Sequence, residues 1–137
     1  MKITIKVAAV IVNKKDQILL IKEKYNSKPK WNLIKGTHDN YEETLEDCVI
    51  REIKEEVGLK AKDPILKNIF QYGDKKSQRL LFVFLVDKFK GKAAVDSKKS
   101  QLSRGEDIIN LKWFSKKEVN KMRKDEFMAP YVYLSLN

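Results

Sequence analysis

The chain has 137 residues, of which 42% are hydrophobic and 35% are charged, and its formal net charge at pH 7 is +10. This length suits one domain around a single core, so we expect one domain over residues 1–137. The sequence has no apolar run of about 20 residues and no signal-peptide pattern, so we expect no membrane association and a cytoplasmic location.

The N-terminal residues predict two strands. β-branched residues alternate and then run together over residues 2–13, which indicates a long strand. Turn residues at 13–16 separate it from a second predicted strand at 17–23, and we expect the two to form a hairpin. Residues 26–30 are expected to form a loop, after which Trp31 and its neighbours return to the core.

A helix is predicted over residues 45–57, with both ends marked. Thr44 is a candidate N-cap, and Asp47 stands three residues on, in the place of the usual capping-box Glu. Gly58 followed by Leu59 is typical of a left-handed C-cap with its apolar follower. One face of the helix is apolar and consists of Val49, Ile53 and Val57, flanked by Leu45 and Ile50.

The neighbouring face of this helix carries Glu52, Glu55 and Glu56 in an arc roughly 100° wide. Anions in a last helical turn oppose the helix dipole, and Glu52 and Glu56 repel each other. Arg51 and Lys54 offset only part of this cost. A hard cation such as Mg²⁺, which prefers oxygen ligands, would relieve it, so the arc is interpreted as a metal site, with a solvated charged face as the alternative.

The remaining elements follow from pattern and composition. The apolar run inside 79–88 is typical of a strand that is buried on both faces. We expect strands at 65–72, 79–88, 93–95 and 108–114, a polar loop at 97–105, and a helix over 116–124 that Ser115 caps. Apolar residues beyond Asp125 could form a terminal helix, although Pro130 prevents one continuous helix there.

The Cys and His content and the net charge limit the possible metal sites and binding partners. With one Cys and one His, zinc ligation is excluded, and Cys48 is expected to be a buried structural thiol. The positive charge attracts polyanions, so both nucleotides and RNA are compatible partners. The basic pairs are scattered and match no known RNA module, which favours a solvated lysine surface over a nucleic-acid face.

The stretch from Trp31 to Leu59 resembles the signature of the Nudix hydrolases. That signature is a Gly, five residues, a Glu, seven residues, and then Arg-Glu-aliphatic-any-Glu-Glu-any-Gly-aliphatic. Residues 51–59 match every specified position, and the opening Trp and Lys-Gly pair are present as Trp31 and Lys35–Gly36. One extra residue lies between Gly36 and Arg51. Because a loop accommodates an added residue more easily than a helix does, we place it in residues 37–42, which makes Glu43 the matching carboxylate.

The resemblance implies an α/β fold, the Nudix α/β/α sandwich with a mixed β-sheet. It also implies roles for particular residues. Metal ligation falls to Glu52, Glu55, Glu56 and the backbone carbonyl of Gly36 or of Lys35, with Arg51 orienting a glutamate. The general base is left open among Glu55, Glu43 and Glu106. Lys35, Gly36 and Trp31 are candidate substrate-binding residues, although an aromatic side chain in Trp31's position also suits the core.

The expected activity is metal-dependent hydrolysis of a phosphoanhydride in a nucleoside diphosphate-linked substrate, of the nucleoside triphosphate or dinucleoside polyphosphate type. Mg²⁺ is the expected cofactor, with Mn²⁺ as a substitute, and water attacks at phosphorus. One alternative is a non-catalytic nucleotide sensor on the same fold. A second is an enzyme that removes a pyrophosphate from RNA 5′ ends, so RNA is the less favoured partner. The sequence leaves the oligomeric state open.

Overall fold

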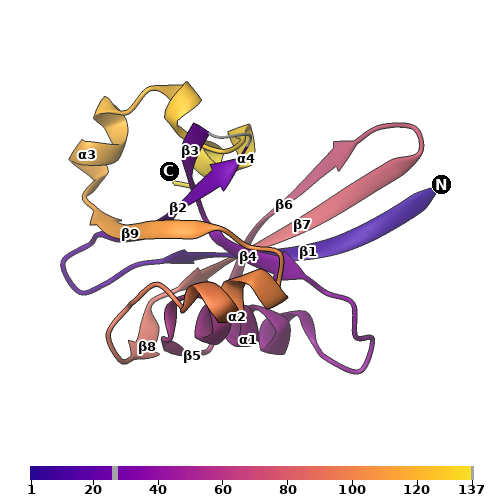
Figure 1. The fold of residues 1–137 in the computed structure, drawn as a ribbon, viewed down its shortest axis with the longest axis horizontal. Coiled ribbons are helices and arrows are strands. Elements are labelled where there is room, and N and C mark those ends of the chain that lie inside the picture. The colour runs from indigo at the N-terminus through magenta and orange to yellow at the C-terminus, as the bar shows by residue number, and fades with distance from the viewer. Residues whose placement is uncertain (26–27, 137) are drawn as a thin grey trace.

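The computed structural model describes residues 1–25 and 28–136. Its strands form two main sheets, with α1 and α2 on one side of the layer and α3 and α4 on the other (Figure 1). The elements are β1 Lys2–Ile11, β2 Ile18–Tyr25, β3 Lys28–Asn32, β4 Ile34–Thr37, α1 Leu45–Val57, β5 Lys60–Lys62, β6 Ile65–Gly73, β7 Ser77–Val86, β8 Lys88–Lys90, α2 Lys98–Ser103, β9 Ile108–Phe114, α3 Lys116–Lys121, a 3₁₀ turn at Lys124–Glu126, and α4 Pro130–Leu134.

The larger sheet is mixed. Its strand order is β4-β1-β7-β6, with β1 and β7 parallel and both outer strands antiparallel to their neighbours. The other sheets have the orders β3-β2-β9 and β5-β8. This α/β sandwich with a mixed sheet confirms the expected fold class.

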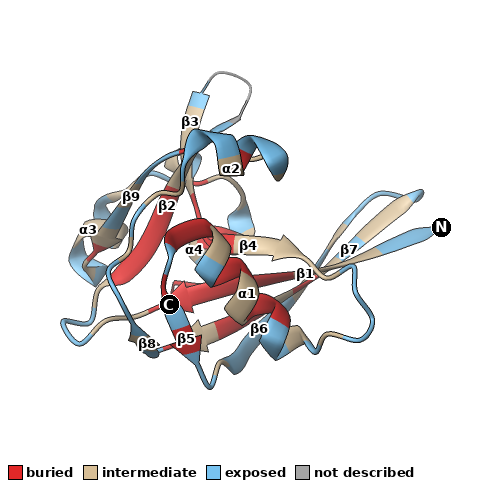
Figure 2. Ribbon diagram, turned by 60° about the horizontal axis from the view of Figure 1, so that its bottom comes forward, coloured by how far each residue is buried: buried red, intermediate tan, exposed pale blue. Residues whose placement is uncertain are grey.

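The central strands are buried on both faces, as the apolar runs predicted. Successive residues of β1 and β2 alternate between two clusters, one packed against α1 and the other against the C-terminal residues around α4. Figure 2 shows the buried residues gathered where β1, β2 and α1 meet, whereas the N-terminal end of β1 and the adjoining end of β7 extend outward. The paired strands β1 and β7 therefore include both a buried segment in the core and an exposed segment that extends from it.

The predicted hairpin between the first two strands is wrong. β1 pairs with β4 and β7, whereas β2 pairs with β3 and β9. Only an isolated bridge, Val12 to Ile18, joins the ends of β1 and β2 across the turn at 13–16. Strands with two apolar faces do not specify which neighbour they pair with, so the local turn did not determine the pairing.

Several loops were also assigned incorrectly. Residues 28–30, expected in a loop, belong to β3, and Pro29 is accommodated there because β3 is an edge strand; residues 26–27 lie outside the described residues. The strand predicted at 93–95 does not form, and the Ala94 N–H donates instead to the carbonyl of Val57 at the end of α1. The polar loop at 97–105 contains α2.

The helix at Ser115 is shorter than expected. It has the capping box between Ser115 and Glu118, but it ends at Lys121 because Met122 adopts extended backbone angles. The terminal segment forms α4, which begins at Pro130, where the fixed φ of proline suits a first helical position. Among the described residues, no helix is both long and apolar enough to cross a bilayer.

Helix α1 has the boundaries predicted from its caps. The Thr44 side chain accepts a hydrogen bond from the Asp47 N–H at 3.0 Å, and Gly58 adopts a left-handed conformation with φ of 75°. The apolar stripe of Val49, Ile53 and Val57 is fully buried. The neighbouring face of the helix, which carries the glutamates, is therefore held at a fixed rotation above the sheet.

Replacing Thr44 by Ala is expected to lower the free energy of unfolding by about 1 kcal/mol, because the Asp47 N–H loses its acceptor. Urea unfolding measures the change. Thr44→Ser keeps the hydroxyl and serves as the control. Equal stability of the Ala and Ser variants would contradict a capping role.

Candidate active site

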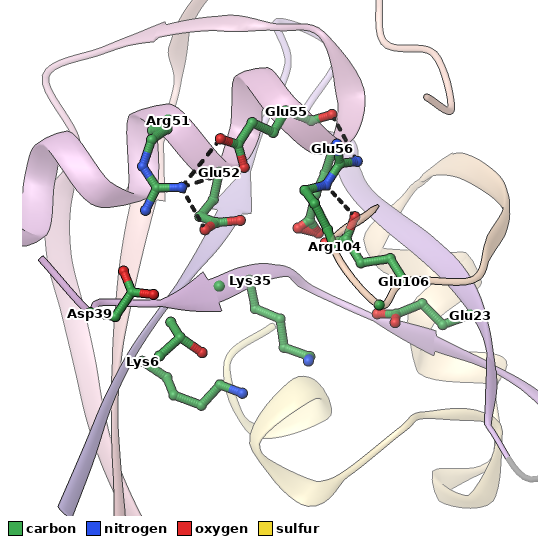
Figure 3. Close-up of a pocket in the computed structure, with 13 residues that line it drawn as sticks. Lys6, Glu23, Lys35, Asp39, Arg51, Glu52, Glu55, Glu56, Arg104 and Glu106 are labelled. Carbon is green, nitrogen blue, oxygen red and sulfur yellow. Dashed lines mark hydrogen bonds and ion pairs between the residues drawn. The ribbon is translucent and has the colours of Figure 1, made fainter. Parts of the chain in front are cut away.

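A cavity of about 460 Å³ opens beside the edge of α1 that carries the glutamates. Figure 3 shows its lining residues, which come from β1, β2, β4, the loop after β4, α1 and the segment before β9. They are Lys6, Glu23, Lys35, Gly36, Thr37, Asp39, Arg51, Glu52, Glu55, Glu56, Arg104, Gly105 and Glu106. Side chains that are far apart in sequence thus share one polar cavity.

Three carboxylates form the centre of this site. One oxygen each from Glu52, Glu56 and Glu106 can be chosen so that all three lie within 4.8 Å of one another. Glu52 and Glu56 are 7% and 2% exposed. Carboxylate oxygens at this spacing are a ligand set suited to a hard divalent cation.

The carboxyl groups of this cluster have raised pKa values. Burial, reinforced by the charges of Glu55 and Glu106, raises the pKa of Glu52 to about 7. Burial also raises the pKa of Glu56 well above its ordinary value, and it raises the pKa of Glu106. Among the described residues, Oε2 of Glu56 is a buried side-chain oxygen without a hydrogen-bond partner. An unpaired, buried carboxylate oxygen beside two other carboxylates fits a cation ligand.

The loop that carries Glu106 is held by a buried glutamine. Gln101 of α2 is 3% exposed, and its side chain accepts from the Ile108 N–H and donates to the carbonyls of Ile108 and Asp96. Its backbone carbonyl accepts from the Glu106 N–H at 2.9 Å. These bonds fix Glu106 opposite α1.

Two arginines hold the carboxylates from outside the cluster. The Arg51 guanidinium donates to both oxygens of Glu43, at 2.9 and 3.1 Å, and also to Glu52 and Glu55. Arg104 donates to Glu106 at 2.7 Å and pairs with Asp96 at 3.0 Å. Each guanidinium thus fixes the orientation of a carboxylate that faces the cavity.

Lysines form a separate part of the cavity. Figure 3 shows Lys6 of β1 and Lys35 of β4 on one side, with Glu52, Glu55 and Glu56 on the other. Burial, reinforced by the charges of Lys35 and Arg79, lowers the pKa of Lys6. Two lysines that face the same cavity provide a site for anionic oxygens.

Gly36 allows the Glu52 side chain of α1 to approach the backbone of β4 closely. A Cβ at this position would lie 1.9 Å from Cδ and 2.4 Å from Cγ of Glu52. The strand is also fixed, because Gly36 pairs with Val7 of β1. The absence of a side chain at residue 36 therefore makes room for the Glu52 carboxylate.

The structure brings most of the expected site residues together. Glu52, Glu55, Glu56, Arg51, Glu106, Lys35 and Gly36 all line the cavity. Glu43 does not line it, and the Arg51 guanidinium lowers the pKa of Glu43. Trp31 lines a different cavity, of about 170 Å³, and its ring also packs edge-on against that of Phe114, with the ring centroids 4.8 Å apart.

Sequence reasoning missed Lys6, Glu23 and Arg104. A single lysine between the apolar residues of β1 was a weak signal for Lys6. The site position of Glu23 depends on the pairing of β2 with β9, and that of Arg104 depends on the fold of α2. Neither the pairing of β2 with β9 nor the fold of α2 is marked by a local sequence pattern.

The raised pKa of Glu52 predicts a pH dependence of stability. Between about pH 4.3, where an ordinary glutamate titrates, and about pH 7, the folded state binds a proton that the unfolded chain has lost. Stability without divalent cations should therefore fall as pH rises through this window. Thermal unfolding in chelator at pH 5 and pH 8 measures the fall, and Glu52→Gln should reduce it. An identical pH response in the variant would contradict the assignment.

The fold and cavity define an α/β/α sandwich protein with a carboxylate cluster suited to a divalent cation. The NUDIX domain pattern matches residues 2–134. The chain belongs to the NUDIX domain family, which confirms the resemblance noted in residues 31–59.

Relatives support this assignment. ADP-ribose pyrophosphatase of Methanocaldococcus jannaschii is 35% identical over 105 residues, which are 74% of this chain and 60% of that protein. The match thus spans less than two thirds of that relative's length. The MutT NUDIX hydrolase of Burkholderia pseudomallei has the same fold, with a TM-score of 0.78, 23% identity, and coverage of 99% of this chain and 97% of that one. The mutator MutT protein of Bacillus halodurans has a TM-score of 0.71, 28% identity, and coverage of 97% and 79%.

Proposed function

We propose that this protein is a metal-dependent hydrolase that cleaves a phosphoanhydride in a nucleoside diphosphate-linked compound. The observation that carries the proposal is the cluster of Glu52, Glu56 and Glu106 oxygens within 4.8 Å, in a cavity that also presents Lys6 and Lys35. Phosphoanhydrides carry several anionic oxygens, so their hydrolysis requires positive charge beside a bound water. This cavity combines ligands for a cation with lysines for phosphate.

Glu52, Glu56 and Glu106 would hold Mg²⁺, or Mn²⁺ in its place. The unpaired Oε2 of Glu56 and the two neighbouring carboxylates, those of Glu52 and Glu106, fit such an ion. When bound, the ion neutralises phosphate charge and lowers the pKa of a coordinated water. Glu55 lines the same cavity but lies outside the set of three oxygens, so we assign it no ligand role.

The other residues position the substrate and the carboxylates. Lys6 and Lys35 bind phosphate oxygens as point charges, which compact ammonium groups do well. Arg51 fixes the orientation of Glu52 and Glu55, and Gly36 leaves space for the Glu52 side chain. In this proposal the phosphates lie between the lysines and α1.

A carboxylate must accept the proton of the attacking water. Glu55 is our candidate, because its side chain is 34% exposed and its contacts with Arg51, at 3.3 and 3.4 Å, are long. Glu106, with its short bond to Arg104, is better placed as a ligand. Glu55→Gln should lower kcat, whereas Glu106→Gln should weaken Mg²⁺ binding.

ADP-ribose is the first substrate to test, because the M. jannaschii relative is an ADP-ribose pyrophosphatase. Nucleoside triphosphates and dinucleoside polyphosphates have the same anhydride chemistry. A non-hydrolysing nucleotide sensor would not need a complete carboxylate cluster, which makes that function less suited to this cavity.

Turnover of a substrate panel tests the proposal. The panel contains ADP-ribose, nucleoside triphosphates, dinucleoside polyphosphates, nucleotide sugars and 5′-triphosphorylated RNA, each with Mg²⁺, with Mn²⁺ and with chelator. Metal-dependent release of phosphate or a nucleoside monophosphate supports the hydrolase and identifies its substrate class. Nucleotide binding without turnover of any substrate would replace the hydrolase by a sensor.

A further inference from the structure

A carboxylate without a cationic partner lies in the cavity, apart from the metal-binding cluster. Glu23 of β2 follows Leu19 and Ile21 on the strand face that packs against α1, and it lines the cavity. Figure 3 shows Glu23 on the same side of the cavity as Glu106. In the part of the chain that the structure describes, no lysine or arginine forms an ion pair with Glu23. Burial raises the pKa of Glu106, and the charge of Glu23 adds to that rise, so Glu23 places negative charge where it is already unfavourable.

A buried asparagine fixes the orientation of Glu23. Asn32 lies opposite Ile21 in the β2–β3 pairing, and its side chain is therefore on the same strand face as Glu23. Its side-chain amide donates to Oε1 of Glu23 at 3.2 Å. Its Oδ1 accepts from the Leu33 N–H at 2.8 Å and from the Tyr131 hydroxyl at 3.2 Å, which determines the rotation of the amide. One carboxylate oxygen of Glu23 is thus held in place, and within the described residues the other, Oε2, accepts no hydrogen bond.

Three kinds of ligand group can meet a carboxylate in this cavity, namely a metal ion, a base or a sugar hydroxyl. Glu23 lies outside the set of three carboxylates whose oxygens come within 4.8 Å of one another, which argues against a role as a further ligand of that cation. The described residues that line the cavity include no aromatic or large apolar side chain, so a base finds no surface to stack on there. A ribose carries hydroxyl donors and directly follows the phosphates in a nucleotide, so it is the group that suits Glu23.

We propose that Glu23 accepts a hydrogen bond from the ribose 2′-hydroxyl of a nucleotide whose phosphates lie against Lys6 and Lys35, and that it thereby selects ribonucleotides over 2′-deoxyribonucleotides. An ionised carboxylate only accepts hydrogen bonds, which matches a hydroxyl donor and repels phosphate oxygens. Acidic residues recognise the same hydroxyl in dinucleotide-binding folds. The inference rests on the proposed function, because it takes a nucleotide as the ligand of the cavity.

Binding of AMP and of 2′-deoxy-AMP, measured by isothermal titration calorimetry with Mg²⁺, tests the proposal. Neither compound contains a phosphoanhydride, so the measurement does not depend on turnover. The native protein is expected to bind AMP about tenfold more tightly, which is the size of effect that a hydrogen bond to a charged group produces. Removing a negative charge from the cavity strengthens the binding of both anions, so the ratio of the two dissociation constants is compared between variants.

Glu23→Ala should bring this ratio to within about twofold of one, because the acceptor is lost. Glu23→Gln keeps an acceptor for the Asn32 amide and should give an intermediate ratio, since a neutral acceptor forms a weaker hydrogen bond. Asp39→Asn is the matched control, because Asp39 lines the same cavity on the side of Arg51 (Figure 3) and its variant should keep the native ratio. Thermal unfolding checks that each variant is folded.

A ratio that Glu23→Ala leaves unchanged would overturn the ribose contact. An equal loss of the ratio in Asp39→Asn would also overturn it, because the charge of the whole cavity would then explain the preference. The substrate panel separates this inference from the proposed function. Turnover of a nucleotide by a native protein that binds the two monophosphates equally, or that does not bind AMP, would overturn the ribose contact alone. Discrimination that depends on Glu23, without turnover of any substrate, would overturn the hydrolase and support the ribose contact.

Discussion

Glu56→Gln is expected to lower kcat about a thousandfold, the result of losing several kcal/mol of charge stabilisation at the reacting phosphate. Glu56 is almost fully buried, its Oε2 has no hydrogen-bond partner, and its carboxylate belongs to the cluster with Glu52 and Glu106. The amide keeps the size of the side chain but cannot supply a negative charge. The substrate that turns over fastest in the panel is used for the measurement.

A second measurement separates metal binding from folding. Mg²⁺ should raise the melting temperature of the native protein, since a ligand bound only by the folded state stabilises it, and this rise should be much smaller in Glu56→Gln. Glu46→Gln, an exposed glutamate on the same helix, is the control and should match the native protein in both measurements. A Glu56→Gln enzyme with unchanged turnover and an unchanged Mg²⁺ response would exclude Glu56 as a ligand.

Gly36→Ala is expected to reduce turnover by about a hundredfold, because displacing a catalytic group by about 1 Å has effects of that size. The new methyl group would lie 1.9 Å from Cδ of Glu52, and pairing with β1 prevents the strand from moving away. Glu52 must therefore move out of the cluster. Overpacking of this kind should also lower stability by about 1 to 3 kcal/mol.

A double-mutant cycle identifies the contact responsible. In a Glu52→Ala background the clash is absent, so Gly36→Ala should no longer destabilise the protein. Gly91→Ala is the control, because Gly91 has a φ of 104° and is exposed outside the cavity, so that variant should lose stability but not turnover. The same destabilisation by Gly36→Ala in both backgrounds would show that Glu52 is not the group displaced.

The predicted pH response complements these variants. Mg²⁺ competes with protons for the same carboxylates, so saturating Mg²⁺ should reduce the loss of stability between about pH 4.3, the ordinary glutamate value, and about pH 7. Glu52 contributes to this effect, and so does Glu56, because burial raises the pKa of both carboxyl groups. The apo protein is thus expected to be most sensitive to divalent cations near neutral pH.

The sequence by itself determined helix α1 and the residues on each of its faces. Caps at Thr44 and Gly58 act within a few residues, and the 3.6-residue period places Glu52 and Glu56 on the side next to the buried stripe. The family signature depends on the same short stretch. Local interactions therefore specified the part of the site that lies on one helix.

Only the tertiary structure decided which distant residues complete the site. Glu106 and Lys6 reach the cavity because β9 pairs with β2 and β1 pairs with β4, and strands that are apolar on both faces do not encode those partners locally. Pairing between strands depends on burial summed over the whole sheet, so the carboxylate cluster exists only once the chain has folded.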